Sequence, residues 1–252
     1  MPDPTSLTVP LDRGASTTAL IYPSHRDSAA ALILAHGAGA GQRSPFMVSF
    51  ARALSERGLD VVTFNFLYTE RLARRSLGGG GRVPDRLPQL VACYRAVVAT
   101  VCEHLAGAGG WRPALAGPSA NSQRLFIGGK SMGGRVATHV AADDPALPGS
   151  AIRGIVLLGY PLHPPGRPDQ LRDAHLPRVG RPMLFVQGSR DAFGTPSELK
   201  PIFENISPSP TLHAIDGGDH SFKLTGRDAN RQAAIYSEIQ DTIVGWIDSI
   251  GS

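Results

Sequence analysis

The feature that most constrains the fold is an alternation of short apolar segments with longer amphipathic ones along the chain. The clearest apolar segment is AALILA at residues 30–35, a continuous run typical of strands buried on both faces of a parallel sheet. Strands that alternate with helices join through right-handed βαβ units, so we expect an α/β fold with a mostly parallel sheet of about eight strands and helices on both faces. The expected strands are residues 6–10 and 17–22, which pair as a hairpin, then 30–35, 60–66, 124–128, 152–158, 182–187 and 211–215, and the expected helices are 45–57, 84–105, 132–142 and 230–250.

Local signals mark the ends of some elements and two irregular stretches. Ser44 is a favourable N-cap for the helix that begins at residue 45, and Gly58 is a favourable stop. Residues 67–83, rich in arginine and glycine, and residues 160–181, rich in proline, break the alternation. Both stretches leave the carboxyl ends of strands, where open α/β sheets hold their binding crevices, although simple solvated loops are the alternative.

Composition and charge exclude several classes of protein. The 252 residues are 42% hydrophobic and show no internal repeat or linker-like boundary, so we expect one domain over residues 1–252 with little or no cap. No apolar run approaches the ~20 residues of a membrane span and the N-terminus lacks a signal-peptide pattern, so we expect a cytoplasmic protein without a membrane partner. The net charge of +4 is spread along the chain, which argues against a nucleic-acid partner.

The cysteines give no sign of a metal site or a disulfide. Cys93 and Cys102 fall nine residues apart in one predicted helix, which places them on opposite faces. Neither belongs to a Cys-x-x-Cys or Cys/His cluster. We therefore expect two buried small side chains, no metal and no cofactor, while the sequence leaves the oligomeric state open.

Residues 129–133, GKSMG, match the pattern Gly-x-Ser-x-Gly. The pattern alone is weak evidence because it also occurs by chance, but here it directly follows an apolar strand and precedes a helical pattern. That setting is what a nucleophile elbow requires, since the sharp turn strains the serine backbone and larger side chains at positions 129 and 133 would collide. Ser131 is therefore the candidate nucleophile, and a serine with a structural role in a turn is the alternative.

A serine nucleophile needs a base to take its proton and an acid to orient that base. His220 lies just after the last predicted strand and before the last helix, in a loop that reaches back over the elbow in such a fold. Asp191 follows the strand at 182–187 and is the candidate acid, with a turn aspartate as its structural alternative. Asp216 and Asp219 are rivals for this role, although Asp219 adjoins His220 and is poorly placed to reach its ring.

An oxyanion hole of two backbone N–H groups would complete such a site. One should come from Met132, the residue after the nucleophile, and the other from the turn that follows residues 30–35. Ala38 is the candidate for the second donor, and its neighbour Gly37 is the alternative. His36, which begins this turn, is expected to support the loop by hydrogen bonds rather than to act on the substrate.

Candidates for the mouth of the substrate pocket are Lys130, Tyr160 and His163, together with arginines of the stretch 71–82. Lys130 is one of three lysines in the chain and immediately precedes the candidate nucleophile. These residues suggest an anionic or carboxylate-bearing acyl substrate. The alternative is that Lys130 points away from the pocket and holds a loop in place.

Several segments match the motifs of a known superfamily, namely 34–41 (LAHGAGAG), 64–66 (FNF), 129–135 (GKSMGGR), 159–166 (GYPLHPPG), 187–191 (QGSRD) and 219–220 (DH). With serine, aspartate and histidine in this order, the chain resembles the α/β-hydrolase superfamily over nearly its whole length. More narrowly, it resembles the dienelactone-hydrolase-related group that includes the testis-expressed-protein-thirty-like hydrolases. The resemblance implies an α/β-hydrolase fold, an intact triad and a hydrolase, but no particular substrate. Dienelactone hydrolases themselves use a cysteine where this chain has Ser131.

The leading functional hypothesis is a serine hydrolase that cleaves a carboxylic ester or a related small acyl substrate through an acyl-enzyme on Ser131. Because the chain is too short for an additional gating domain, small substrates are favoured. A peptidase or an acyltransferase would use the same residues, so both are alternatives. A non-catalytic protein-interaction module on the hydrolase scaffold is another, since some relatives resemble non-catalytic subunits of chromatin complexes.

Overall fold

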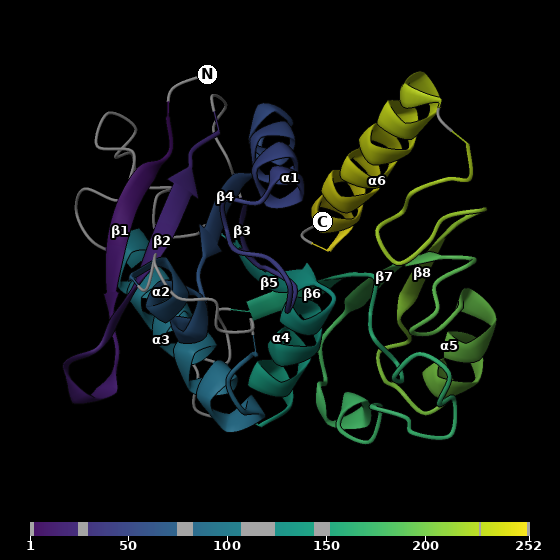
Figure 1. Cartoon of the computed structure of the whole chain (residues 1–252), viewed down its shortest axis with the longest axis horizontal. Coiled ribbons are helices and arrows are strands. Elements are labelled where there is room, and N and C mark those ends of the chain that lie inside the picture. The colour runs from purple at the N-terminus through teal and green to yellow at the C-terminus, as the bar shows by residue number, and fades with distance from the viewer. Residues whose placement is uncertain are drawn as a thin grey trace.

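A central sheet organises the molecule (Figure 1). The computed structural model describes residues 3–24, 30–74, 83–106, 124–143, 152–226 and 228–250. The strands in this part of the chain are β1 (Thr5–Pro10), β2 (Ser16–Tyr22), β3 (Ala30–Ala35), β4 (Asp60–Phe64), β5 (Arg124–Lys130), β6 (Ile152–Leu158), β7 (Met183–Gly188) and β8 (Thr211–Ile215). They form one eight-stranded sheet in the order β1-β2-β4-β3-β5-β6-β7-β8. The pairs β1–β2 and β2–β4 are antiparallel and the others are parallel, which confirms the expected sheet and hairpin.

The register of the sheet brings three strand ends together. Ala35, the last residue of β3, pairs with Gly129 of β5, and Gly129 pairs with Leu157 of β6. Because parallel strands run in the same direction, the residues that follow these three strands meet at one edge of the sheet. The candidate functional segments lie at this edge. β3 itself is buried along its whole length, as its continuous apolar sequence predicts.

The described helices cover both faces of the sheet (Figure 1). They are α1 (Pro45–Glu56), α2 (Leu67–Arg74), α3 (Leu87–Ala106), α4 (Met132–Ala142), α5 (Pro196–Phe203) and α6 (Ala229–Ser249), with short 3₁₀ helices at Asp12–Gly14 and Leu176–Arg178. Side chains of α1 and α6 pack into one apolar cluster, and side chains of α3, α4 and α5 pack into the other. The sheet separates the two clusters. Within the described residues no inserted domain caps the carboxyl edge of the sheet, as expected for a minimal α/β-hydrolase fold.

Two helices in the structure are not predicted by the sequence. α2 occupies the first part of the stretch 67–83 that was expected to be irregular, and the remainder, residues 75–82, lies outside the described residues. It is helical because Tyr68 and Leu72, four residues apart, both face the core while its other residues are mostly polar. A helix of two turns with so few apolar residues is too short to show a recognisable helical period in the sequence.

α5 is the second unpredicted helix, and its start is marked by a capping box. The Thr195 hydroxyl accepts from the backbone N–H of Glu198, and the Glu198 carboxylate accepts from the backbone N–H of Thr195. Its prolines, Pro196 and Pro201, obscure the helical pattern in the sequence. Ser44, in contrast, directly precedes α1 but makes no capping hydrogen bond with its side chain.

The two cysteines lie on α3 as expected, and both are free thiols. Cys93 is buried, whereas Cys102 is half-buried against the apolar cluster. Among the described helices, none combines the length and the apolar character that crossing a lipid bilayer would need.

Candidate active site

Ser131 occupies the sharp turn between β5 and α4. Its φ and ψ are 52° and −119°, outside the regions that residues other than glycine favour, and its N–H donates to the Leu158 carbonyl of β6 at 2.9 Å. A Cβ atom on Gly129 would lie 2.5 Å from the carbonyl carbon of Gly133, and one on Gly133 would lie 2.5 Å from the Ala35 oxygen. Only glycine fits at these two positions, so the local sequence creates the turn that presents the Ser131 hydroxyl.

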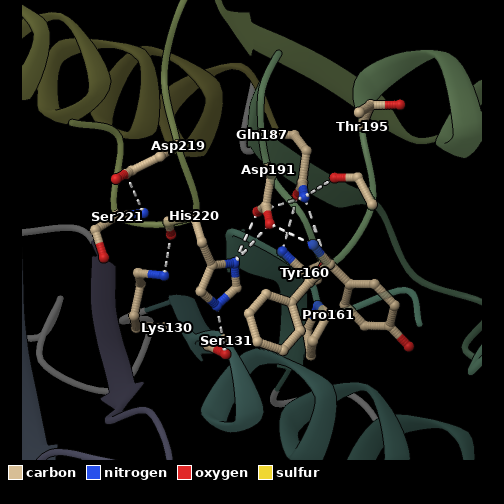
Figure 2. Close-up of polar contacts among 12 residues, drawn as sticks. Lys130, Ser131, Tyr160, Pro161, Gln187, Asp191, Thr195, Asp219, His220 and Ser221 are labelled. Carbon is tan, nitrogen blue, oxygen red and sulfur yellow. Dashed lines mark hydrogen bonds and ion pairs between the residues drawn. The ribbon is translucent and has the colours of Figure 1, made fainter. Parts of the chain in front are cut away.

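A continuous chain of hydrogen bonds links Ser131 to His220 and Asp191 (Figure 2). The Oγ of Ser131 lies 2.8 Å from His220 Nε2, and His220 Nδ1 lies 2.8 Å and 2.9 Å from the two oxygens of Asp191. An ionised carboxylate only accepts hydrogen bonds, so Nδ1 carries the proton and Nε2 is free to accept the Ser131 proton. This is the geometry that activates a serine hydroxyl.

The Asp191 carboxylate is fully buried and its remaining contacts come from β7 and the loop that follows it. One oxygen accepts from the backbone N–H of Phe193 at 2.8 Å, and the other accepts from Nε2 of Gln187 at 2.9 Å. Gln187 is itself buried, and its Oε1 accepts from the backbone N–H of Tyr160 at 2.8 Å. Gln187 is not among the residues predicted from the sequence, although an amide near the carboxyl end of an otherwise apolar strand is a detectable signal.

The other two candidate aspartates are engaged elsewhere. Oδ1 of Asp219 accepts from the backbone N–H groups of Ser221 and Lys223 at 2.7 and 2.9 Å, which shapes the loop that carries His220 (Figure 2). Asp216 accepts from the Ser189 hydroxyl. Neither contacts the His220 ring, so the geometry favours Asp191 as its partner.

The turn after β3 is held by His36. Nε2 of His36 accepts from the backbone N–H of Phe66 at 3.2 Å, which leaves the proton on Nδ1 to donate to the Gly37 carbonyl at 2.8 Å. Burial lowers the pKa of His36 to about 4, so the ring is neutral. In a trans peptide the N–H points away from the C=O, and the Gly37 contact therefore directs the Ala38 N–H away from His36.

The other candidate oxyanion donor, besides Ala38, is Met132, the first residue of α4. The first N–H groups of a helix have no partner within the helix, and they favour negative charge nearby. Ala38, Gly37 and Ser131 line one cavity, which places the turn after β3 beside the elbow.

The cavity has a volume of about 730 Å³, and its walls are mainly apolar. Phe46 and Met47 of α1 and Tyr236 of α6 line it, and the Phe46 ring meets the Tyr236 ring edge-on with 6.0 Å between centroids. Phe193 packs against the His220 ring with 4.2 Å between ring centroids. Its other lining residues are Gly37, Ala38, Gly39, Ala40, Ser44, Pro45, Ser49, Lys130, Ser131, His220, Ser221 and Lys223. None of these carries a carboxylate, and two of the three lysines of the chain are among them.

The structure does not bring the other pocket candidates to this cavity. Tyr160 is fully buried and its hydroxyl donates to the Arg172 carbonyl at 2.6 Å. His163 is also buried and contacts Glu198 at 3.2 Å. Neither lines the cavity, because the chain after β6 turns away from the elbow toward α5.

Of the arginines expected at the mouth, Arg71 is the one whose side chain the structure describes, and it does not line the cavity. Arg71 forms an ion pair with Asp85, while the side chain of Arg74 and the whole of Arg75 and Arg82 lie outside the described part of the chain. The ammonium group of Lys130 donates to the backbone carbonyl of His220, so it holds the His220 loop. In the part of the chain that the structure describes, no cluster of His, Cys, Asp and Glu side chains could hold a metal ion.

The fold is shared with several solved structures. A dienelactone hydrolase from Anabaena variabilis is 18% identical and superposes with a TM-score of 0.67 over 95% of this chain and 97% of its own. An α/β serine hydrolase without lid from Xanthomonas campestris is 20% identical, with a TM-score of 0.62 over 98% and 96%. An α/β serine hydrolase homologue from Coxiella burnetii is 17% identical, with a TM-score of 0.66 over 96% and 98%. At these identities the likeness is one of fold.

The family is established by the sequence itself. The model of the alpha/beta hydrolase domain family matches residues 28–248, which include β3, the elbow and the loops that carry Asp191 and His220. The matched region therefore contains Ser131, His220 and Asp191, the three residues linked by hydrogen bonds in the candidate site. The chain belongs to the alpha/beta hydrolase domain family.

Proposed function

We propose that this protein is a serine hydrolase that cleaves esters of small carboxylic acids through an acyl-enzyme on Ser131. The observation that carries the proposal is the unbroken series of hydrogen bonds from Asp191 through His220 to the Ser131 hydroxyl, which opens into a cavity of about 730 Å³. The strained elbow supports it as well, because backbone strain at a functional side chain persists only where the surrounding structure enforces it.

In the acylation half of the reaction, Ser131 Oγ attacks the ester carbonyl carbon while His220 Nε2 takes the hydroxyl proton. The imidazolium is stabilised by the buried Asp191 carboxylate, which already binds Nδ1. The electron pair of the carbonyl π bond moves onto oxygen, where the N–H groups of Met132 and Ala38 would bind it. When the tetrahedral intermediate collapses, the ester C–O bond breaks and the leaving alcohol takes the proton from His220.

Deacylation repeats these steps with water as the nucleophile. His220 Nε2 takes a proton from water as the water oxygen attacks the acyl carbon, and the same two N–H groups bind the second oxyanion. Collapse releases the carboxylic acid, and the proton returns from His220 to Ser131 Oγ. The cycle consumes one water and needs no redox partner.

The cavity supports a substrate with an apolar body. Phe46, Met47, Phe193 and Tyr236 contribute to its walls, so linear or ring-sized acyl and alcohol groups would bury apolar surface there. No cap shields the cavity within the described residues, and water can therefore reach the acyl-enzyme. Hydrolysis is accordingly favoured over transfer to an alcohol, which requires a drier site.

The direct test is the intact mass of the protein after exposure to a fluorophosphonate probe. We expect one adduct on the wild type, no adduct on Ser131→Ala, and slow labelling of His220→Ala. Ser197→Ala, on the exposed surface of α5, is the matched serine control and should label like the wild type. Nitrophenyl esters of increasing acyl length would then report turnover. A folded wild type that takes up no probe would refute the proposal and favour a non-catalytic binding role.

A further inference from the structure

Lys130 is a buried cation with no evident structural reason to be charged. It precedes Ser131 at the end of β5 and is only 9% exposed. Burying an ammonium group is costly unless it is paired, and a well-packed apolar side chain of similar size commonly stabilises a protein at least as well. A charge at this position therefore calls for an explanation in the site around it.

The Lys130 head group contacts the loop that carries the candidate base. Its Nζ donates to the backbone carbonyl of His220 (Figure 2). It also lies 5.4 Å from the centroid of the Phe222 ring. Gly159, at the end of β6, makes room for this contact. With φ of +64°, a Cβ atom there would lie 3.0 Å from both Lys130 Nζ and the His220 oxygen. The side chain is thus enclosed by segments that follow β6 and β8.

The stem of Lys130 passes beside the turn after β3. A Cβ atom on Gly37 would lie 3.9 Å from Lys130 Cγ and 3.6 Å from Ser131 Cβ. One side chain therefore lies beside the turn that bears Ala38 and contacts the loop that bears His220, while its own backbone leads into the elbow. In Figure 2, Lys130 and Asp191 lie on opposite sides of His220, so the histidine is held from both sides.

We propose that Lys130 is a positioning residue that fixes the His220 loop against the elbow, so that His220 Nε2 stays within reach of Ser131 Oγ during both proton transfers. The inference rests on the hydrolase reaction proposed above. The charged head group matters because a charge-assisted hydrogen bond to a carbonyl is stronger than a neutral one. A fixed carbonyl on His220 restricts the main chain from which the imidazole projects, and small displacements at a base strongly reduce the rate.

Burial of the ammonium group makes this contact sensitive to pH. Burial lowers the pKa of Lys130 to about 8, and the charges of Asp191 on the loop after β7 and Asp219 on the loop after β8 oppose this shift. His220 is the other titratable group beside the ammonium. Above about pH 8 the head group becomes a neutral amine, which donates a weaker hydrogen bond to the His220 carbonyl. We therefore expect the rate of Ser131 labelling to decline at alkaline pH.

The experiment compares the wild type with Lys130→Met, which keeps the length of the stem and removes the charge. The matched control is Lys200→Met on the exposed face of α5. We expect Lys130→Met to melt within a few degrees of the wild type, because loss of a buried charge offsets loss of one hydrogen bond. Its fluorophosphonate labelling and kcat should fall about 10- to 100-fold, with KM for an ester little changed. The alkaline decline of the wild type should be absent from the variant.

Three results with the Lys130→Met variant would overturn the inference. The first is a variant that reacts with the fluorophosphonate probe and turns over an ester as fast as the wild type does. The second is a rise in KM confined to an anionic ester with kcat unchanged, which would assign Lys130 to substrate binding. The third is a Lys130→Met variant that melts at a much lower temperature but is fully active while folded. That result would give Lys130 a structural role only. If the methionine variant does not fold, Lys130→Gln, with a neutral donor, is measured in the same way. A wild type that is folded but not labelled overturns the proposed function and this inference together, whereas a labelled wild type confines any failure to Lys130.

Discussion

The Gln187 side chain donates a 2.9 Å hydrogen bond to Asp191 and a 2.6 Å hydrogen bond to the Gly194 carbonyl, and both contacts are buried. Gln187 is the penultimate residue of β7 and Asp191 follows it by four residues, so one short segment supplies the candidate acid and the amide that holds it. The amide oxygen also binds the N–H of Tyr160, which follows β6. Gln187 thus ties together the ends of two neighbouring strands beside the candidate triad.

Gln187→Glu tests this arrangement with almost no change in shape. A second carboxyl group beside Asp191, away from water, favours its neutral form, so its pKa in the folded protein will lie above that in the unfolded chain. The loss in free energy of unfolding relative to the wild type should then be small near pH 5 and increase as the pH rises toward 8. This is because the unfolded chain releases a proton that the folded protein keeps. Urea unfolding at both pH values measures this, and a penalty independent of pH would contradict it.

Asp191→Asn and Asp219→Asn separate the two neighbouring candidates for the acid. We expect Asp191→Asn to lose roughly 1000- to 10,000-fold in kcat, because an amide no longer fixes the reactive tautomer of His220 or stabilises its positive charge. Asp219→Asn should retain most of the activity, since its amide oxygen can still accept from the N–H groups of Ser221 and Lys223. Ester hydrolysis by the two purified variants decides the question, and the reverse order would transfer the role to Asp219.

Much of the architecture could be predicted because it depends on local sequence. Buried parallel strands appear as unbroken apolar runs, as in β3, and the elbow is specified by glycines within five residues of one another. The order of Ser131, Asp191 and His220 along the chain follows from the order of the strands they succeed. These features need no knowledge of how distant loops pack.

The remaining features depend on tertiary packing, which cannot be inferred from the sequence of a single segment. Tyr160 and His163 follow β6 as a pocket residue would, yet the proline-rich chain there turns toward α5 and buries both side chains. Phe193 packs on the His220 ring only because the loops after β7 and β8 lie side by side. The direction in which a loop leaves its strand is set by tertiary contacts, and sequence pattern does not specify it.

Two buried histidines and one half-buried histidine should make the fold sensitive to acid. Burial lowers the pKa of His36 to about 4 and that of His175 to about 3, and it also lowers the pKa of His139, whose ring stacks on His175 at 3.6 Å between centroids. Below about pH 6.5 the unfolded chain binds protons that the folded protein excludes. The free energy of unfolding should therefore fall with decreasing pH, by up to about 1.4 kcal/mol per pH unit for each such histidine.

Urea unfolding at pH 7 and pH 5 measures this dependence, and His175→Phe provides the comparison. The phenyl ring can still stack on His139 but cannot take up a proton, although the contact with Thr138 at 2.8 Å is lost. We expect the variant to be less stable than the wild type at pH 7 and to lose less stability on acidification. Equal losses in the two proteins would show that the stacked pair does not bind protons differently in the folded and unfolded states.

Ser131→Gly should separate catalysis from stability at the elbow. The backbone at Ser131 has φ of 52° and ψ of −119°, a conformation that is unfavourable for residues with a Cβ atom and accessible to glycine. Both Ser131→Gly and Ser131→Ala remove the hydroxyl, so neither should react with a fluorophosphonate probe. Because only glycine also relieves the backbone strain, we expect its variant to be more stable than the alanine variant by about 1 kcal/mol, despite the greater flexibility of glycine in the unfolded chain. Urea unfolding of the two variants at one pH tests this, and an alanine variant as stable as the glycine variant would mean that the elbow stores no strain.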